Sequence, residues 1–212
     1  MKIISDGFIP AGFLSGKDAV LQTSESLKAV CEFSDASFSR ILFPKQIHSN
    51  IILEDKEGEG DGIITSTPGT CACIKTADCF SVAAADTPNN VFGIFHSGWR
   101  GTLKNIVGEG ISAMKKHGAS EINAVIFPGI EKCCFEIGSE LVPVFKKNKI
   151  PVEKKRNQLF ADIKSCIKNQ LEKSGVKNIK DLSVCTCCNE KFYSYRRNGT
   201  SKRYLSFIIC PG

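Results

Sequence analysis

Two short apolar runs, residues 80–86 and 91–95, constrain the fold of this chain most strongly. Only residues 87–90, a turn-forming Thr-Pro-Asn-Asn sequence, separate them. Short apolar runs bounded by turn residues predict two buried β-strands that form a hairpin. Cys79 precedes the first strand and His96 follows the second, so the two side chains are expected to be neighbours. A thiolate beside an imidazole suits a metal or a Cys-His nucleophile pair, although a buried cysteine and a hydrogen-bonded histidine fit the hairpin equally well.

Similar patterns predict the other elements of the chain. Strands are expected at the N-terminus, after His48, on either side of Pro68-Gly69, over residues 122–127 and 182–187, and in a hairpin around Asn198-Gly199. Apolar residues at helical spacing predict helices over residues 24–33, 103–114, 138–147 and 160–171. Because the chain contains no internal repeat and no low-complexity linker, we expect a single domain that spans residues 1–212.

Charge and hydropathy exclude several classes of protein. The 28 basic and 22 acidic residues give a net charge of +6, but the lysines in excess are spread along the chain without interleaved aromatic residues. This pattern favours a solvated basic face, which would attract a small anionic substrate, over a nucleic-acid site. No stretch approaches the roughly 20 apolar residues that span a bilayer, and the start of the chain, broken by Gly7 and Pro10, does not resemble a signal peptide. We therefore expect a cytoplasmic protein that binds neither nucleic acid nor membranes.

The eleven cysteines are an odd number, and some are adjacent in sequence. Without an export signal, they are expected to be reduced thiols. The CTCC sequence at residues 185–188 suggests a zinc knuckle or a redox pair, but a structural zinc site needs a second pair at suitable spacing. Because Cys133 and Cys134 are directly adjacent, buried and reduced cysteines are expected here instead. Cys71 and Cys73 share one face of a strand, where we expect them to pack.

Several polar residues near these strands are candidates for catalysis. His48 stands at a predicted strand edge, where it is free to converge on a site, although a lone histidine is more often structural. Asp61 and Asp78 suit a general acid or base, or a group that caps and orients its neighbours. The GWRGT sequence after His96 predicts a strand, a glycine-containing loop and a helix N-terminus. Together with Arg100 these form a candidate anion site.

Six segments, in this order along the chain, resemble the YfiH-type laccase-domain family: KQIHSN, DGIITSTPG, TADCFSV, FHSGWRGT, FPGIEKCCFEIG and CTCCNEKFYSYRRNGTSKR. The family also carries the names multicopper polyphenol oxidoreductase and purine nucleoside phosphorylase, and its bacterial members are linked to peptidoglycan editing. The resemblance covers residues 40–210. It implies an α/β (α+β) fold in which mixed β-sheets pack between helices, related to a toxin domain with a Cys-His pair.

The resemblance also implies a metal site. The family binds one zinc ion through His, Cys and His, which correspond to His48, Cys79 and His96 in this sequence. Three protein ligands leave one tetrahedral position open, as in catalytic zinc sites. We expect this to be the only His/Cys set that converges in the fold. His117, at a lysine-rich helix end, matches no family motif and is expected to be exposed.

The activity implied by the resemblance is phosphorolysis of adenosine, inosine, guanosine and methylthioadenosine, together with deamination of adenosine. The partners would be a purine nucleoside and phosphate, and the protein would be a monomer or a homodimer. The residues expected in catalysis are Cys79, Asp78 and Arg100. The residues expected to contact the substrate are Gln46, Asp61 and Arg196. Phe127 in FPGI and the SKR sequence at residues 201–203 depart from the family pattern, so they are expected near the pocket, where they would affect substrate preference.

Three other functions are alternatives to this activity, and the motifs weigh against two of them. A copper-binding polyphenol oxidoreductase, or laccase, would need on the order of ten imidazoles for its copper centres, whereas this chain has three histidines. Copper nevertheless stays an alternative metal at the zinc site. A Cys-His amidase, as in peptidoglycan editing, would use Cys79 as a thiolate nucleophile. A zinc-stabilised interaction module would need four protein ligands, and the motifs supply three.

Overall fold

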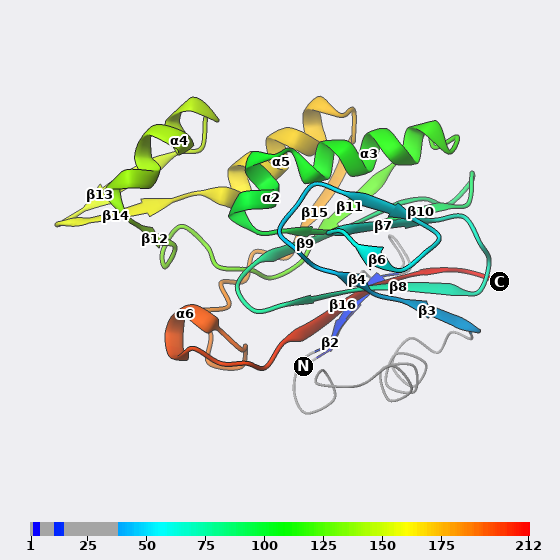
Figure 1. The fold of residues 1–212 in the computed structure, drawn as a ribbon, viewed down its shortest axis with the longest axis horizontal. Coiled ribbons are helices and arrows are strands. Elements are labelled where there is room, and N and C mark those ends of the chain that lie inside the picture. Colours follow the sequence, from blue (N-terminus) through cyan, green and yellow to red (C-terminus); the bar gives the residue numbers. More distant parts are fainter. Residues whose placement is uncertain (1, 5–10, 15–37) are drawn as a thin grey trace.

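The computed structural model describes residues 2–4, 11–14 and 38–212. Two main β-sheets lie face to face, and α3 (Ile106–Lys116) and α5 (Ile163–Lys173) cover the outer face of one of them (Figure 1). Both sheets mix parallel and antiparallel pairs, which confirms the predicted α/β (α+β) class. The helix predicted over residues 24–33 lies outside the described residues.

The sheet beneath the helices contains the predicted hairpin. Its strands lie in the order β15 (Asn178–Asp181), β11 (Asn123–Ile126), β9 (Phe80–Asp86), β10 (Val91–Ser97), β7 (Gly62–Thr65) and β5 (Ile52–Glu54). In the hairpin, Phe80 lies opposite Ser97, so Cys79 and His96 are at the same end. Every residue of β9 and β10 is buried, because this sheet is covered on both faces. Coverage on both faces explains why these strands read as continuous apolar runs.

The second sheet packs against the free face of the first. Its strands lie in the order β1 (Lys2–Ile4), β2 (Ala11–Leu14), β16 (Tyr204–Cys210), β8 (Thr70–Thr76) and β3 (Arg40–Leu42). Facing side chains, among them Ile74, Ile208 and Phe92, form one apolar cluster between the two sheets. Cys71 and Cys73 pack in a separate cluster with Ile41 of β3 and with side chains of β16, as predicted for one face of a strand.

The smaller strands and helices complete the fold. β12 (Glu136–Ile137), β14 (Gln158–Ala161) and β13 (Val152–Lys155) form a three-stranded sheet, and β4 (Pro44–Lys45) pairs with β6 (Gly58–Glu59). A 3-10 turn at Ser139–Leu141 precedes α4 (Val142–Lys147). Across the part of the chain that is described, no helix is long and apolar enough to cross a membrane.

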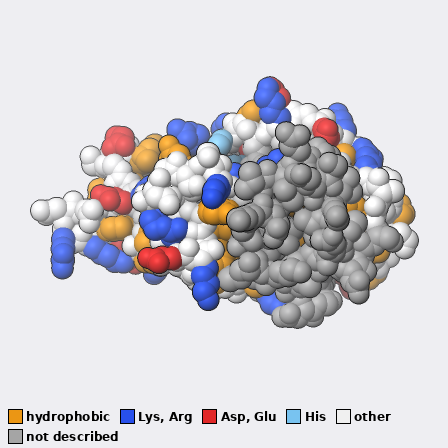
Figure 2. Space-filling model, turned by 90° about the horizontal axis from the view of Figure 1, so that it is seen from below, with side chains coloured by type: hydrophobic (Ala, Val, Ile, Leu, Met, Phe, Trp, Pro, Cys, Tyr) orange, Lys and Arg blue, Asp and Glu red, His pale blue; other side chains and the backbone are white. Residues whose placement is uncertain are grey.

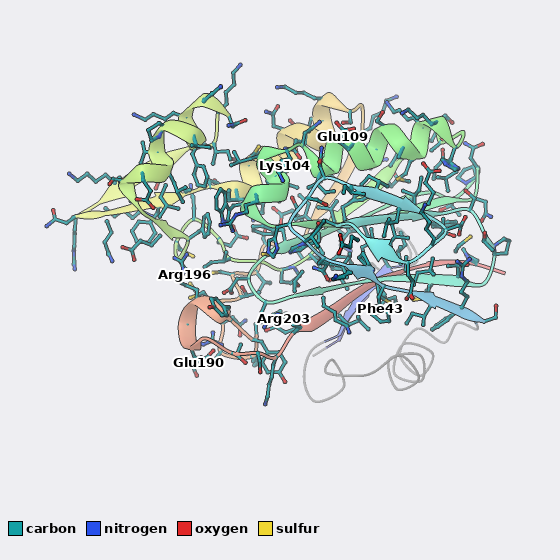
Figure 3. All side chains as sticks on the ribbon, viewed as in Figure 1. Phe43, Lys104, Glu109, Glu190, Arg196 and Arg203 are labelled. Atoms are coloured by element: carbon teal, nitrogen blue, oxygen red, sulfur yellow. The ribbon has the colours of Figure 1, made fainter. Side chains whose placement is uncertain are left out.

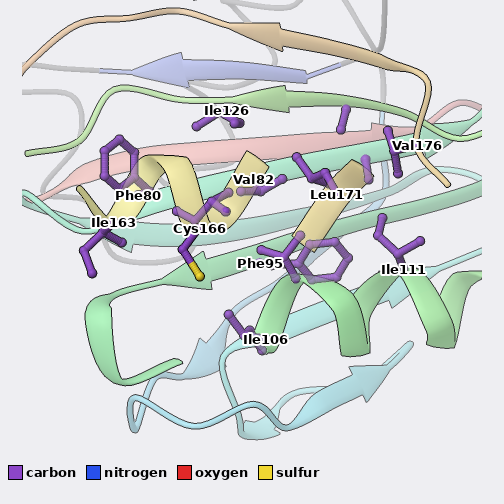
Figure 4. Packing of buried hydrophobic residues seen from close by; sticks show 14 of the residues in the cluster. Phe80, Val82, Phe95, Ile106, Ile111, Ile126, Ile163, Cys166, Leu171 and Val176 are labelled. Carbon is purple, nitrogen blue, oxygen red and sulfur yellow. The ribbon is translucent and has the colours of Figure 1, made fainter. Parts of the chain in front are cut away.

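The largest apolar cluster lies between the helices and the first sheet (Figure 4). α3 contributes Ile106 and Ile111, α5 contributes Leu171, and β10 contributes Phe95. Burial of each of these side chains stabilises the fold by about 1.5–3 kcal/mol. The hairpin is therefore held between two apolar layers, and its polar end projects at their edge.

The helix predicted over residues 103–114 corresponds to α3, which begins later, and Leu103 ends a separate short helix. α2 spans Trp99–Leu103, and α3 begins only at Ile106 because Asn105 has a left-handed backbone conformation with φ of 64°. α5 begins at Ile163, later than predicted, because the side chain of Asp162 accepts a hydrogen bond from the backbone N–H of Ser165. His117 follows the last residue of α3, and its side chain is 39% exposed, as predicted.

Two predictions near the C-terminus are wrong. Residues 182–187 do not form a strand, because β15 ends at Asp181 and the chain turns at Ser183, which has φ of 47°. No hairpin forms around Asn198-Gly199. A short helix, α6 (Tyr195–Asn198), ends there at Gly199, whose φ of 63° favours glycine.

Candidate active site

His48, Cys79 and His96 converge at one end of the hairpin. One ligand atom of each lies within 4.8 Å of the others, and the two imidazole rings meet edge to face with their centroids 5.0 Å apart. Cys79 immediately precedes β9, and His48 lies on the loop between β4 and β5. His96 belongs to β10, which continues to Ser97 and so extends beyond the predicted strand. Both the hairpin and the loop are thus needed to assemble the cluster.

Asp61 holds two members of this cluster in place. It is fully buried, and its Oδ1 lies 2.8 Å from His96 Nδ1 and accepts the backbone N–H of His48 at 3.0 Å. Its Oδ2 accepts the backbone N–H and the hydroxyl of Ser49 at 2.6 and 2.7 Å. These bonds retain His48 in a left-handed conformation, with φ of 58°, that costs on the order of 1–3 kcal/mol. Because Nδ1 is engaged by Asp61, His96 presents Nε2 to the cluster.

The electrostatics of the cluster favour an ionised thiol. Burial raises the pKa of Cys79, but hydrogen bonds with His48 and His96 outweigh burial and bring the pKa to about 6. Burial lowers the pKa of His96, whereas hydrogen bonds with Asp61 and Cys79 raise it to about 9. Burial also raises the pKa of Asp61, but its bonds with His96 and Ser49 hold that pKa well below the usual range. A thiolate beside two imidazoles can coordinate a metal or act as a nucleophile.

Asp78 organises the opposite side of the cluster. Its Oδ1 accepts the hydroxyl of Thr186 at 2.7 Å, and its Oδ2 accepts the hydroxyl of Ser194 at 3.0 Å and the backbone N–H of Arg196 at 2.7 Å. Its backbone carbonyl accepts the N–H of Ile130 at 2.7 Å. Because these contacts fold the C-terminal segment around one carboxylate, that segment forms neither the predicted strand nor the predicted hairpin.

A cavity of about 650 Å³ opens over the cluster. Aromatic surface comes from Trp99, Phe135 and Tyr195, and positive charge comes from Lys75, Arg196 and Arg203. Its size lies in the range of small-molecule sites. The lining therefore suits a small ligand that has a planar, weakly polar part and an anionic part.

The predicted substrate and catalytic residues divide into two groups. Gln46 and Arg196 line the cavity, although the Gln46 amide also pairs with the backbone N–H and carbonyl of Lys75. Asp61 and Arg100 are not among the lining residues. Asp61 lies beneath the cluster, and Arg100 is exposed, with its guanidinium 4.3 Å from the centre of the adjacent Trp99 ring.

The sequence argument did not single out Lys75 and Arg203 as charges of the cavity. Arg203 precedes β16 and Arg196 lies on α6, on the same side of the molecule (Figure 3). The available signal was position: Lys75 adjoins the TADC motif, and Arg203 ends the SKR segment that was expected near the pocket. Phe127, expected there too, is instead buried in the cluster between the two main sheets.

On the face shown in Figure 2, Lys and Arg side chains stand apart from one another, with acidic side chains between some of them.

The donor set and the space beside it fit a zinc ion. Two imidazoles and a thiolate are ligands that zinc prefers. Gly98 lies against them, because a Cβ added there would be 3.0 Å from Cys79 Sγ, 3.4 Å from His48 Cδ2 and 3.6 Å from His96 Cε1. A side chain at this position would therefore press on all three ligands, and glycine keeps the cluster open toward the cavity.

A second group of metal-ligating side chains also converges, contrary to the expectation of a single set. Four sulfurs lie within 4.8 Å of one another, and they belong to Cys133, Cys134, Cys185 and Cys188. All four are free thiols, but the prediction that they are buried is wrong, because two of them are exposed and two are half-buried. Adjacent cysteines lack the spacing of a zinc knuckle, but the fold supplies the second pair from another segment.

The fold and the Cys-His-His cluster together define a laccase-domain protein of the YfiH type. The sequence profile described as multi-copper polyphenol oxidoreductase laccase matches residues 13–211, and the chain belongs to this family. The chain is 40% identical over 176 residues to a purine nucleoside phosphorylase of Clostridium acetobutylicum, covering 78% of this chain and 75% of that protein. It is 31% identical over 175 residues to a purine nucleoside phosphorylase of Aquifex aeolicus, covering 80% of this chain and 82% of that protein.

Solved structures share the fold. YlmD from Geobacillus stearothermophilus superimposes with a TM-score of 0.82 over 97% of this chain and 93% of that chain, at 22% sequence identity. The hypothetical protein YfiH of Bacillus licheniformis superimposes with a TM-score of 0.79 over 93% of this chain and 91% of that chain, at 23% identity. The predicted family and its mixed α+β architecture are thereby confirmed.

Proposed function

We propose that this protein is a zinc-dependent purine nucleoside phosphorylase that also deaminates adenosine. One observation carries the proposal: the His48–Cys79–His96 cluster opens into a cavity whose walls are both aromatic and cationic. The names of the Clostridium and Aquifex relatives support the reaction class.

In this proposal His48, Cys79 and His96 hold the zinc ion, and Asp61 keeps His96 and the His48 loop in position. The bound ion would supply Lewis acidity with one open coordination position. Copper binds the same donor types, so its content must be controlled in any assay. The three histidines of the chain are too few for the centres of a multicopper oxidase.

In this proposal, different residues of the cavity bind the phosphate and the purine nucleoside. Phosphorolysis brings an anionic phosphate against C1′ of the sugar while the purine departs with the bonding electron pair. Lys75, Arg196 and Arg203 offer fixed positive charge for the phosphate. Two hydrogen bonds from Nη1 of Arg203 to backbone carbonyls orient its guanidinium, and a guanidinium has five N–H groups in all. Trp99 and Tyr195 offer aromatic surface on which a purine can stack.

The proposed substrates are adenosine, inosine, guanosine and methylthioadenosine, with phosphate as the second substrate. A cavity of about 650 Å³ has room for a nucleoside and a phosphate together. Free thiols at all ten cysteines in the described ranges suit a reducing compartment, so the location that we propose is the cytoplasm. The oligomeric state that we propose is a monomer or a homodimer.

A second candidate function, a Cys-His amidase, is favoured by the way in which Cys79 contacts His96 and His96 contacts Asp61. These residues have the arrangement of a nucleophile, a base and an orienting carboxylate. In that reaction the Cys79 sulfur would form a bond to the amide carbon, and His96 would protonate the departing amine. A metal bound to Cys79 would block this attack, so metal content separates the two candidates.

Product analysis of zinc-loaded protein tests the proposal. We expect hypoxanthine from inosine only when phosphate is present, and inosine from adenosine without phosphate. Cys79→Ala, purified in the same way, is the control for contaminating enzymes and should form neither product. If the zinc-loaded wild type forms neither product while the metal-free protein hydrolyses amides, the amidase replaces the phosphorylase.

A further inference from the structure

The cluster of Cys133, Cys134, Cys185 and Cys188, here called the four-cysteine cluster, lies outside the active site. Cys188 is its centre, with its Sγ 3.4 Å from the Sγ of Cys133 and 3.2 Å from that of Cys134. The two pairs come from different parts of the chain, the loop before β12 and the segment between β15 and α6. The fold therefore brings together four sulfurs whose spacing in the sequence does not predict a shared site.

These distances are close to those of a tetrahedral metal site. A zinc–sulfur bond of about 2.3 Å places the sulfurs of a tetrahedral site about 3.8 Å apart. The cluster, in which all four sulfurs lie within 4.8 Å of one another, needs only a small adjustment to enclose an ion. The backbone groups of Glu131, Cys188 and Cys187 hydrogen-bond to the sulfur of Cys185. Backbone donors around a sulfur are what a metal-bound thiolate requires from its surroundings.

We propose that the four-cysteine cluster is a second metal site, a closed tetrathiolate that binds zinc in a structural role. Four protein ligands leave no position for a substrate, and a tetrahedral set of sulfurs selects zinc or iron over hard cations. The site is separate from the His48–Cys79–His96 cluster, so the inference does not depend on the proposed activity.

The site would fasten one wall of the active-site cavity. The loop that carries Cys133 and Cys134 also carries Phe135 of the cavity lining, and the segment after Cys188 carries Tyr195. Among the described residues, the only ladder contact between these segments is the isolated bridge between Gly129 and Cys185, so few regular elements hold them together.

Arginine side chains already bind the backbone of both segments. Arg196 Nη1 donates to the carbonyls of Cys134 and Glu136, and Arg197 Nη1 donates to the carbonyls of Thr186 and Cys187. These contacts orient the backbone around the sulfurs. A metal at the cluster would complete the connection.

Metal analysis of the whole protein, purified under reducing conditions without chelator, tests this site. We expect about two zinc ions per chain in the wild type and about one in Cys188→Ser. Cys187→Ser is the matched control, because Cys187 lies in the same segment but outside the cluster, and it should keep about two. Cys79→Ala should lose the other ion and keep this one.

A cobalt spectrum gives a readout that does not require the Cys188 variant to fold. Cobalt-loaded Cys79→Ala should show intense thiolate-to-cobalt charge transfer of a four-sulfur site, and zinc addition should remove it. Thermal unfolding of the zinc-loaded wild type should occur at a higher temperature than that of the chelated protein. A zinc content that is equal in the wild type and in Cys188→Ser, iron in place of zinc, or an intact mass that reveals a disulfide within the cluster would each overturn the proposal.

Discussion

Nδ1 of His96 lies 2.8 Å from Oδ1 of Asp61, and the two side chains are 3% and 0% exposed. The same carboxylate accepts the backbone N–H groups of Ile47, His48 and Ser49. One buried residue therefore orients a ring on the hairpin and a loop that is distant in sequence. Asp61 does not line the cavity and acts through these neighbours, so it is a positioning residue.

Asp61→Asn should weaken zinc binding by about 10- to 100-fold, the usual effect of losing a partner that orients a ligand. The amide cannot accept the same set of hydrogen bonds, so His96 and the His48 loop lose their alignment. Competition with a chelator measures the affinity. Asp86→Asn, at the other end of the same hairpin, is the control and should leave zinc affinity unchanged. Equal zinc affinity of the Asp61 variant and the wild type would contradict the positioning role.

Replacement of His48 and of His117 should have opposite outcomes. His48→Ala should release about one zinc ion per chain, because only two ligands of the active-site set remain. His117→Ala should keep all bound zinc, since His117 lies at the end of α3, where its Nε2 is 3.3 Å from Oε2 of Glu54. Zinc analysis after gel filtration decides between them, and loss of zinc in the His117 variant alone would show that the ligand set is misassigned.

Arg203→Ala should lower kcat/KM for inosine phosphorolysis by about 30- to 1000-fold, which corresponds to about 2–4 kcal/mol of transition-state stabilisation. Arg100→Ala should change it by less than about threefold, because this side chain stacks on Trp99 outside the cavity lining. Initial rates at varied phosphate, with zinc content checked in both variants, provide the comparison. If the Arg100 variant lost more activity than the Arg203 variant, the phosphate would instead bind at the N-terminus of α2, beside Arg100.

Gly98→Ala should lower zinc affinity by about tenfold or more without unfolding the protein. The added Cβ would lie 3.0 Å from Cys79 Sγ and would push the thiolate away from its position. The backbone itself tolerates alanine, because Gly98 has φ of −72° and ψ of 164°. Chelator competition and thermal unfolding, measured on the same preparation, separate the two effects. Unchanged affinity would show that the cluster has more room than the structure indicates.

Asp86→Asn should destabilise the fold in a pH-dependent manner. Burial raises the pKa of Asp86, but hydrogen bonds from the Asn89 side chain and from the backbone of Glu121, Ser120 and Asn89 outweigh burial and lower it. A lowered folded-state pKa stabilises the fold above the unfolded pKa of about 3.9, and this stabilisation is lost as the pH falls through the folded value.

The variant should therefore be less stable than the wild type by about 1.5–3 kcal/mol at neutral pH, the range for hydrogen bonds to a charged group. The difference should shrink below about pH 4. Urea unfolding at several pH values measures it, and a difference that is constant with pH would exclude the carboxylate charge as its source.

The sequence by itself determined the hairpin, the helical spacing of α3 and α5, and the family. The hairpin and the helices depend on local periodicity, and the family depends on the order of short motifs, so both can be read from the sequence alone. It also predicted that His48, Cys79 and His96 lie together, although the place of His48 in this set came from family resemblance rather than from spacing.

Only the tertiary structure decided the roles of Asp61 and Asp78, the charges of the cavity and the four-cysteine cluster. A buried carboxylate collects donors from distant segments, and Asp78 thereby draws the C-terminal segment out of the strand and the hairpin that its local pattern favours. The sulfurs of Cys134 and Cys188 meet although 54 positions separate them. Contacts of this kind follow from how the sheets and loops pack together, so no local pattern along the chain encodes them.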